Sequence, residues 1–414
     1  MNKALMSETV LYTATWLFNP GEKPLAGGAL AVRNNIILDV GTADELARRY
    51  NIDKYIDYPG CVLLPGFVNA HTHLELTHFP DWRKQAEITD IPADFTDWIL
   101  QMVRVKRSIN EGDIIASFKS GAQACLQAGT AFVGDIVSSP ELLPFIGSVR
   151  LGGRYFSELI GHEQSSFRQR LNTLLQLLQE QADTTCPGLS PHAPYTLSET
   201  VLVDIAQAAK QHSLPLSLHL TESAAEIDLL HDSSGAIAEK LYPLAGWQQF
   251  LPPPRKTTPA RFFDAGGLLT DKTIAVHCVH CSQTDAQLLK KRGVTICLCP
   301  RSNHKLGVGS APVSLFKRLQ IPLCLGTDSL ASNDSLSLWD EIRFAVDHYN
   351  GELTPDQLLT MATSGGAAAL GIAASAGTLS AGKQAAFQVV ELSGNCTAEN
   401  LIEGGKLIAT NCHL

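Results

Sequence analysis

Two histidines separated by one residue, His71 and His73, stand at the end of an apolar run that begins near residue 62. Side chains alternate between the two faces of a β-strand, so residues two apart lie on the same face. Both imidazole rings can therefore bind one ion, because imidazole nitrogen is a common ligand of zinc. Such a pair alone gives only a moderate indication of a metal site. His78 is expected to be a surface or packing residue.

A second segment places His219 at the end of the apolar run Leu216-Ser-Leu-His219, with Glu222 three residues later. A histidine at the tip of a strand is well placed as a third ligand. Glu222 would face the same cavity, where a carboxylate can accept a proton from metal-activated water. The alternative is that Glu222 only favours the N-terminus of a helix. A ligand followed at this spacing by a base favours the catalytic interpretation.

Two more apolar segments end in residues of this kind, His277 and Asp328. His277 can orient the attacking water or polarise the atom under attack. Asp328 follows a Gly-Thr turn, where it is well placed as the last metal ligand. The other interpretation of Asp328, a helix N-cap, is better filled by Ser332 or Asn333. His280, just beyond the strand, is expected to be structural or to face the substrate.

Four cysteines raise a competing interpretation, a zinc site made of thiolates: Cys278, Cys281, Cys297 and Cys299. A closed site of this kind would leave the histidines unexplained. The cysteines lie in apolar, strand-like runs, where a free thiol behaves as a small hydrophobic group. The chain has 10 cysteines without a dense pattern of paired spacings, so we expect buried, reduced thiols and a cytoplasmic protein.

The candidate residues share a position in the predicted fold. From residue 63 onward, apolar strands alternate with helical stretches, which is the pattern of a parallel sheet. In an eight-stranded parallel barrel, the carboxyl ends of all strands meet at one mouth, and the eighth strand closes against the first. Asp328 is therefore expected beside His71 and His73. The predicted strands end at or near His71, Asp135, Glu158, His192, His219, His277, Cys299 and Asp328.

The predicted architecture is an α/β protein, a (β/α)8 TIM-like barrel with a small β-sandwich domain formed from both chain ends. Short β-rich runs precede the barrel, with one short helix near residues 43–50, and β character returns after residue 387. We expect the first half of the small domain at 1–62, the metal-binding barrel at 63–372, and the second half of the small domain at 373–414.

Composition limits the classes of partner. The chain has 414 residues, of which 45% are hydrophobic and 18% charged, so a large buried core is expected. Its net charge of -9 and its 32 scattered Lys and Arg argue against nucleic acid as a partner. No apolar run approaches the length of a membrane span, and the first residues lack a signal-peptide pattern. A small-molecule substrate is expected, and a homodimer is compatible with the sequence.

These segments resemble the amidohydrolase superfamily. More narrowly, they are similar to its branch of cytosine, guanine, S-adenosylhomocysteine and aminodeoxyfutalosine deaminases and triazine chlorohydrolases. The resemblance covers nearly the whole chain, and the motifs occur in the same order. One departure is Ala386, where the family's Gly-Lys-x-Ala-Asp motif has an acidic residue. The matching segments are Pro65–His73, Ser190–Tyr195, His219–Glu222, His277, Cys299–Asn303, Gly326–Asn333 and Gly382–Lys383.

The resemblance implies a mononuclear metal site, usually with zinc and sometimes with iron. Binuclear relatives carry a carboxylated lysine that the segment 188–192 lacks. Glu222 would then move protons, His277 would orient the water, and Asp328 would help pass a proton to departing ammonia. The implied metal ligands are His71, His73, His219 and Asp328. The expected substrate contacts are Trp98, Arg154, His192, Ser302, Asn303 and Ser332.

We expect a metal-dependent hydrolytic deaminase that releases ammonia from an amino-substituted purine or an adenosine-type nucleoside. The S-adenosylhomocysteine deaminases tend to carry an acidic residue for the ribose after a tryptophan that resembles Trp98, but the stretch Arg104–Arg107 is basic. It indicates a substrate with its own carboxylate, such as 6-aminodeoxyfutalosine, or else a solvated helix face. Arg154 is equally compatible with a structural role.

Other reactions use the same activated water. A chlorohydrolase and a ring-opening amidohydrolase of the imidazolonepropionase type are the alternative enzymes. A non-catalytic ligand-binding barrel is the alternative outside enzymology, and the complete set of metal and proton-transfer residues argues against it. The roles of His280, His304 and the basic stretch Arg104–Arg107 are left open by the sequence.

Overall fold

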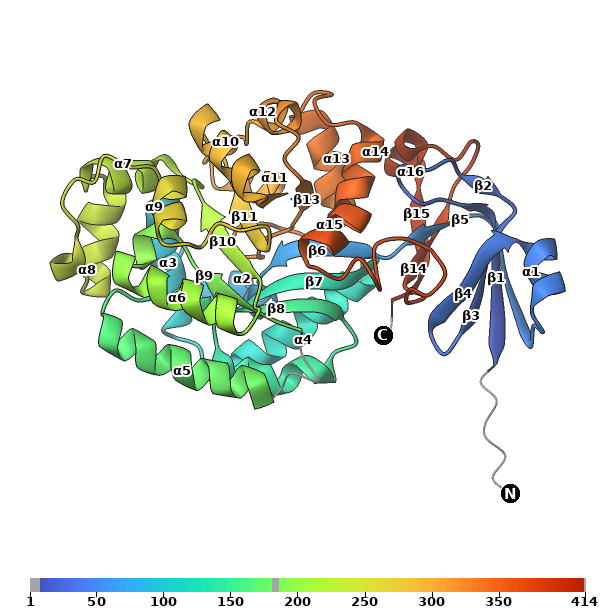
Figure 1. The fold of residues 1–414 in the computed structure, drawn as a ribbon, viewed down its shortest axis with the longest axis horizontal. Helices are drawn as coiled ribbons and strands as arrows, with labels where there is room; N and C mark the ends of the chain where they lie inside the picture. The colour runs from blue at the N-terminus through green and yellow to red at the C-terminus, as the bar shows by residue number, and fades with distance from the viewer. Residues whose placement is uncertain (1–7, 181–185, 413–414) are drawn as a thin grey trace, which may run out of the picture.

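The computed structural model describes residues 8–180 and 186–412. Two sheets organise this part of the chain, one of 8 strands and one of 7 strands. In Figure 1 the first strands (blue) and the last strands (red) lie side by side in the smaller sheet, next to the barrel. The predicted barrel with a small β unit built from both chain ends is confirmed. The three predicted domain boundaries stay predictions.

The larger sheet is a parallel barrel whose strands neighbour each other in chain order. All 8 residues of β7 are buried, as expected for parallel strands covered by helices. Every strand end named from the sequence falls within three residues of the end of an observed strand. The strands are β6 (Phe67–Thr72), β7 (Thr130–Val137), β8 (Gly152–Leu159), β9 (Pro187–Pro191), β10 (Leu216–Leu220), β11 (Thr273–His277), β12 (Thr295–Leu298) and β13 (Leu323–Leu325).

The barrel closes between β13 and β6. The backbone N–H of Asp328 donates to the carbonyl of His71 at 3.1 Å, and the Thr72 hydroxyl donates to the carbonyl of Asp328 at 3.0 Å. Nearby, Asn69 Nδ2 donates to Thr327 Oγ1 at 2.7 Å, while the Thr327 N–H donates back to Asn69 Oδ1 at 3.0 Å. The predicted proximity of the first and eighth strands is therefore confirmed.

One set of helices follows the barrel strands and covers the outside of the barrel (Figure 1). Their ends carry ordinary caps: α10 begins after Ser282, which forms a capping box with Asp285, and ends at Gly293 with φ 74°. The helices are α4 (Glu111–Gln127), α5 (Gln164–Glu180), α6 (Glu199–Gln211), α7 (Ala224–Asp232), α9 (Pro259–Ala265), α10 (Gln283–Arg292), α12 (Val313–Arg318), α13 (Leu338–His348), α14 (Pro355–Thr360) and α15 (Gly366–Ala369).

Other helical segments lie in the connections, and several of them surround the mouth. The segment after β6 includes α3, which turns its apolar residues toward the mouth, and the segment after β10 includes η4 and α8. These segments are η1 (Leu74–Leu76), α2 (Phe79–Gln85), α3 (Phe95–Lys106), η2 (Pro140–Ser148), η3 (Pro194–Thr196), η4 (Ile237–Leu241), α8 (Tyr242–Ala245), η5 (Gln248–Phe250), α11 (Pro300–Lys305) and η6 (Met361–Gly365).

The smaller sheet is mixed, with the order β15-β14-β5-β1-β3-β4 and β2 paired to β1. Its strand β5 runs through the predicted boundary at residue 62 and leads directly into the barrel. The expected helix α1 is present at Ala43–Arg49. The strands are β1 (Thr9–Leu17), β2 (Leu25–Ala26), β3 (Gly28–Arg33), β4 (Ile36–Thr42), β5 (Lys54–Pro65), β14 (Phe387–Glu391) and β15 (Lys406–Asn411), with α16 (Ala398–Gly404) between the last two.

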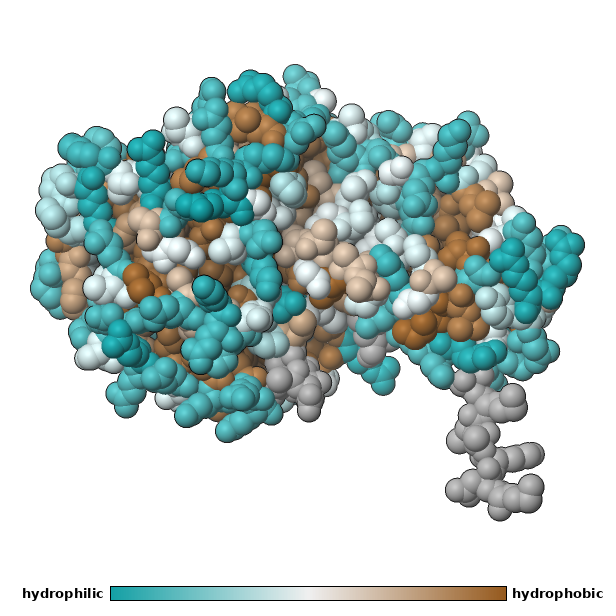
Figure 2. Space-filling model, in the orientation of Figure 1, coloured by the Kyte–Doolittle hydropathy of each residue, from teal (hydrophilic) through white to brown (hydrophobic). Residues whose placement is uncertain are grey.

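The face shown in Figure 2 is mostly covered by hydrophilic residues, with smaller hydrophobic areas between them. Within the described ranges, no helix combines the length and the apolar character that a membrane span requires.

Tight packing at the barrel closure predicts the effect of a single methyl group. A Cβ atom at Gly326 would lie 2.8 Å from His71 Cβ and 2.9 Å from Cys297 Sγ. We expect Gly326→Ala to lower the free energy of unfolding by about 1–3 kcal/mol, because overpacking must displace these atoms. Denaturant unfolding measures the change. Gly404→Ala is the matched control, since a Cβ there meets nothing within 4 Å. Equal stability of the two variants would contradict the expectation.

Candidate metal centre and active site

Three histidines meet at the carboxyl ends of the barrel strands. His71 lies on β6, His73 directly follows β6, and His219 lies on β10. One ring nitrogen from each lies within 4.8 Å of the other two. Asp328 Oδ1 lies 3.8 Å from His71 Nε2 and 3.6 Å from His73 Nε2. The structure therefore brings together the four metal ligands that the family resemblance implied.

The state of these side chains fits a bound divalent ion. Both ring nitrogens of His71 are buried and have no hydrogen-bond partner among the described residues. Burial and the neighbouring imidazoles hold the pKa of His71 well below its ordinary value, and burial lowers the pKa of His73 to about 4. Both rings are then neutral at pH 7, which is the form that binds metals. Three imidazoles with one carboxylate suit zinc or iron.

A second layer of hydrogen bonds orients these ligands. His219 Nδ1 lies 2.9 Å from the backbone carbonyl of His192, so Nδ1 carries the proton and Nε2 presents its lone pair. Asp328 Oδ2 accepts from the hydroxyls of Ser302 at 2.7 Å and Ser332 at 2.8 Å. Oδ1 is the oxygen that faces the histidines. The structure thus places the hydroxyls of Ser302 and Ser332 against Asp328 rather than against a substrate.

Glu222 and His277 lie beside the proposed ligands. His277 Nε2 is 3.5 Å from Glu222 Oε1, and both groups have an atom within 4.8 Å of Asp328. His277 Nδ1 lies 2.8 Å from Asn303 Oδ1 and donates to it, which leaves the lone pair on Nε2. Asn303 therefore orients His277 in this structure. Burial, with the nearby charge of Asp328, raises the pKa of Glu222 well above its ordinary value.

The backbone at these strand tips adopts a conformation that L-residues rarely take. Thr221 has φ 50°, His277 has φ 71°, Cys278 has φ 50° and Asp328 has φ 58°. Such left-handed residues are uncommon outside glycine and collect at functional sites. The bend at Cys278 is held by its N–H, which donates to the carbonyl of Leu220 at 3.0 Å. The sequence gives no sign of this geometry.

The buried carboxylate of Glu226, which was not among the predicted site residues, positions Glu222. It accepts from the backbone N–H groups of Thr221 at 2.8 Å and Glu222 at 3.3 Å. Burial raises the pKa of Glu226 to about 8. The spacing Ser223-x-x-Glu226 matches a helix capping box, and Ser223 does cap α7. This pattern could have marked Glu226 as a structural partner of the catalytic loop.

A second carboxylate that the sequence did not reveal, Glu341 on α13, joins helix α11 to the loop after β13. It accepts from the Arg301 N–H at 3.2 Å and from Asn333 Nδ2 at 2.7 Å. Helix α11 also carries Ser302 and Asn303, and the loop carries Asp328. Burial raises the pKa of Glu341 to about 8. No local sequence pattern marks this residue, because its partners lie on other elements.

A cavity of about 360 Å³ opens in front of these residues. Its volume is in the range of small-molecule sites. Of the substrate contacts expected from the sequence, Trp98 and His192 line it. The apolar part of the wall is formed by Leu76, Phe95, Trp98, Ile99, Met102, Val103, Ile160, Leu241 and Trp247. The polar lining beyond the proposed ligands includes Lys106, Arg107, Ser138, Glu158, His192, Tyr195, Thr196, Glu222, His277 and Ser329.

Arg154 does not line this cavity, so the substrate contact expected of it is wrong. Its guanidinium donates to the carbonyls of Leu370 at 2.9 Å and Pro187 at 2.6 Å. Pro187 is the first residue of β9, so these contacts lie toward the amino ends of the strands. The residue is structural because two backbone carbonyls already hold its charge away from the mouth.

Two of the open questions about side chains have structural answers. His280 Nε2 lies 2.9 Å from the carbonyl of Val308, and the His304 ring packs 5.3 Å from that of Phe344. Lys106 lines the cavity, but it already binds Glu75 Oε1 at 3.2 Å. The basic stretch is therefore partly neutralised.

The cysteines do not form the alternative metal site. All 10 are free thiols, and nearly all of them are buried. In the part of the chain that the structure describes, the side-chain groups able to hold an ion consist of histidine and carboxylate, with no cysteine. The thiolate-site interpretation is therefore wrong.

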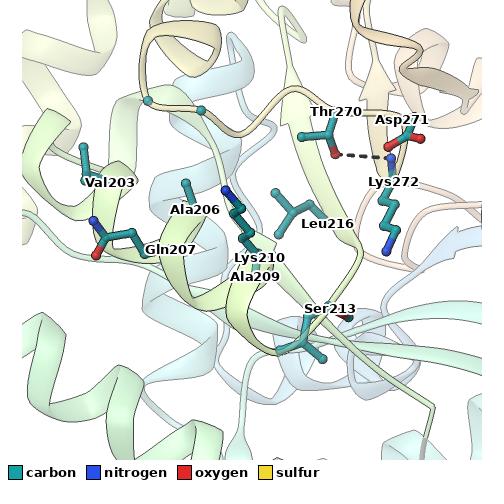
Figure 3. Close-up of a pocket in the computed structure, with 13 residues that line it drawn as sticks. Val203, Ala206, Gln207, Ala209, Lys210, Ser213, Leu216, Thr270, Asp271 and Lys272 are labelled. Atoms are coloured by element: carbon teal, nitrogen blue, oxygen red, sulfur yellow. Dashed lines mark hydrogen bonds between the residues drawn. The ribbon is translucent and has the colours of Figure 1, made fainter.

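A different hollow lies near the amino ends of the barrel strands, and Figure 3 shows the residues that line it. It is lined by residues of α6 and of the loop before β11, including Lys210, Asp271 and Lys272. Leu216, the first residue of β10, also borders it. The amino ends of barrel strands serve stability rather than chemistry, so this hollow is separate from the candidate active site.

The two hydroxyls on Asp328 predict a measurable change in metal affinity. We expect Ser302→Ala with Ser332→Ala to weaken metal binding about 10–100-fold, because Oδ2 loses both donors and the carboxylate is free to rotate. Competition with a chelator of known affinity measures this change. Ser310→Ala is the control, since that exposed hydroxyl binds His348. Unchanged affinity in the double variant would contradict the orienting role.

Known proteins resemble this chain over most of its length. The model of the Amidohydrolase family matches residues 62–410. A 5-methylthioadenosine/S-adenosylhomocysteine deaminase of Syntrophobacter fumaroxidans is 31% identical over 398 residues, covering 90% of this chain and 82% of that protein. An aminodeoxyfutalosine deaminase of Deinococcus radiodurans is 29% identical over 378 residues, covering 89% of this chain and 85% of that protein.

Solved structures show the same fold. A Xanthomonas campestris adenosine deaminase with bound zinc has a TM-score of 0.79 and 25% identity, covering 96% of this chain and 89% of that one. A Helicobacter pylori aminofutalosine deaminase in complex with methylthio-coformycin has a TM-score of 0.82 and 24% identity, covering 97% of each chain. The family match extends over most of the sequence, and this chain belongs to the amidohydrolase family.

Proposed function

We propose that this protein is a metal-dependent hydrolytic deaminase of an adenosine-type nucleoside, with 6-aminodeoxyfutalosine as the first candidate. The observation that carries the proposal is the close grouping of Glu222, His277 and Asp328 beside three neutral histidines at the base of the cavity. Relatives named as deaminases of 5-methylthioadenosine, S-adenosylhomocysteine and aminodeoxyfutalosine support this reaction class.

His71, His73, His219 and Asp328 would hold one divalent ion, with zinc preferred and iron as the alternative. When bound, such an ion makes water a nucleophile at neutral pH. The orientation of these ligands is set by the hydrogen bonds on His219 Nδ1 and Asp328 Oδ2. They are in place before any substrate enters.

Glu222 is the group that moves protons. It accepts a proton from the attacking water and returns it to the ring nitrogen next to the attacked carbon. His277 directs its Nε2 lone pair toward the same space and orients the water. Asp328 assists the transfer of a proton to the departing ammonia.

The cavity wall suits a nucleoside. Trp98 and Trp247 offer flat apolar surfaces for a base or an aromatic substituent. Arg107 lines the same cavity and is exposed, so it can bind a substrate carboxylate such as a benzoate. Lys106 is less available because Glu75 already binds it. Buried free cysteines support a reducing compartment, and we place the reaction in the cytoplasm.

Replacing the proton-transfer group tests the mechanism. We expect Glu222→Gln to keep its full metal content and to lose turnover by about 10²–10⁴-fold, because the amide cannot accept the proton. Ammonia release and metal analysis of the purified variant give both quantities. Glu239→Gln, an exposed glutamate on η4, is the control. Full activity in Glu222→Gln would refute its assigned role.

A substrate panel tests the reaction class. We expect ammonia from adenosine derivatives, with 6-aminodeoxyfutalosine compared directly with 5-methylthioadenosine, S-adenosylhomocysteine and adenosine. Aminopurines and pterins complete the amino-substituted rings. A chlorotriazine assayed for chloride and an imidazolone assayed for ring opening represent the alternative activities. Turnover of only one of these last two compounds would replace the deaminase proposal.

A further inference from the structure

Glu158 is a carboxylate of the cavity wall that the mechanism above does not use. It lies near the end of β8, and its side chain is only 11% exposed. The nearest basic atom recorded for it, His192 Nε2, lies 4.0 Å from Oε1, which is too far for a hydrogen bond. No described residue donates a hydrogen bond to this carboxylate. A nearly buried acceptor left open toward a cavity is suited to a ligand.

The neighbouring charged side chains, Lys106 and Glu75, already bind each other. Lys106 Nζ binds Glu75 Oε1 at 3.2 Å and donates to Ser138 Oγ at 2.7 Å. Ser138 in turn holds Glu75 through both its hydroxyl and its N–H. Burial raises the pKa of Glu158 to about 7, which Lys106 opposes and Glu75 reinforces. Glu158 therefore stands beside a neutralised pair rather than inside an ion pair of its own.

His192 presents a second acceptor to the same space. The Thr196 hydroxyl donates to the carbonyl of Ala193 at 2.9 Å, so it can only accept from His192 Nδ1 at 3.1 Å. Nδ1 thus carries the proton, and Nε2 points its lone pair toward Glu158. Two acceptors that face each other across 4.0 Å match a ligand with two adjacent hydroxyl groups.

The position of Glu158 along the mouth indicates which part of a ligand it meets. β8, β9 and β10 are neighbours in the barrel, and β10 carries His219. Two strand spacings separate β8 from β10, about 10 Å in total. The attacked carbon must lie beside Glu222, at the β10 side. Glu158 therefore faces the end of the substrate that is remote from the reacting carbon.

We propose that Glu158, together with His192, binds the vicinal hydroxyl groups of the substrate's sugar and thereby selects ribonucleosides. This assignment rests on the proposed deaminase function. Each sugar hydroxyl donates one hydrogen bond, either to the Glu158 carboxylate or to His192 Nε2. Glu158 is then a specificity residue that acts on binding, since it lies away from the reacting atoms.

The test compares the unmodified protein and a Glu158 variant on two substrates, one with the sugar hydroxyls and one without them. Ammonia release is measured for the best adenosine derivative of the panel and for its 2′,3′-dideoxy analogue. We expect Glu158→Gln to lower kcat/KM for the hydroxylated substrate about 10–100-fold, because the carboxylate that accepts the hydrogen bonds of the sugar hydroxyls is lost. The loss should appear mainly in KM. For the dideoxy analogue, kcat/KM should change less than about threefold, since this substrate has no sugar hydroxyls that Glu158 could bind.

Two further variants make the result decisive. Ser138→Ala changes the same wall, but its hydroxyl is occupied by Lys106 and Glu75, so both substrates should respond equally. Glu158→Asp retains the carboxyl group on a shorter side chain and should give an intermediate loss confined to the hydroxylated substrate. Equal losses on both substrates in Glu158→Gln would overturn the assignment. Failure of the unmodified protein to release ammonia from any nucleoside would instead overturn the deaminase proposal.

Discussion

The contact between the first and last strands of the barrel is the constraint on which the site depends. It places Asp328 against His71 and His73, although Thr72 and Asp328 are 256 residues apart in the chain. The reciprocal bonds between Asn69 and Thr327 hold the same closure one step below the ligands. Without this contact the histidines of β6 would lack their carboxylate, and the remaining strand tips would have no common centre to face.

In each of three groups around that centre, a hydrogen bond on one side of the group leaves the atom that faces the centre available. His219 uses Nδ1, His277 uses Nδ1, and Asp328 uses Oδ2 for support. Glu226 and Glu341 orient the nearby backbone in the same way, by accepting from the N–H groups of Thr221, Glu222 and Arg301. Preorganisation of this kind reduces the reorganisation that a reaction must otherwise supply.

Much of this arrangement could be predicted from the sequence because strand periodicity and barrel topology are local and regular. Apolar runs ending in His71, His219, His277 and Asp328 gave both the fold and the grouping of these residues. The sequence could not show that Ser302 bonds Asp328 or that Arg154 holds backbone carbonyls, because side-chain pairing across elements depends on the folded geometry. The left-handed backbone conformation at the strand tips could not be predicted for the same reason.

The small sheet has a consequence for how the protein is made. Gln388 Nε2 donates to the carbonyl of Pro65, and these residues are 323 positions apart. Strand β14 pairs with β5 immediately before the chain enters the barrel. During synthesis the amino-terminal strands must therefore wait for nearly the whole chain to leave the ribosome before their sheet is complete. Contacts of such long range slow folding and leave an open strand edge exposed to chaperones and aggregation in the meantime.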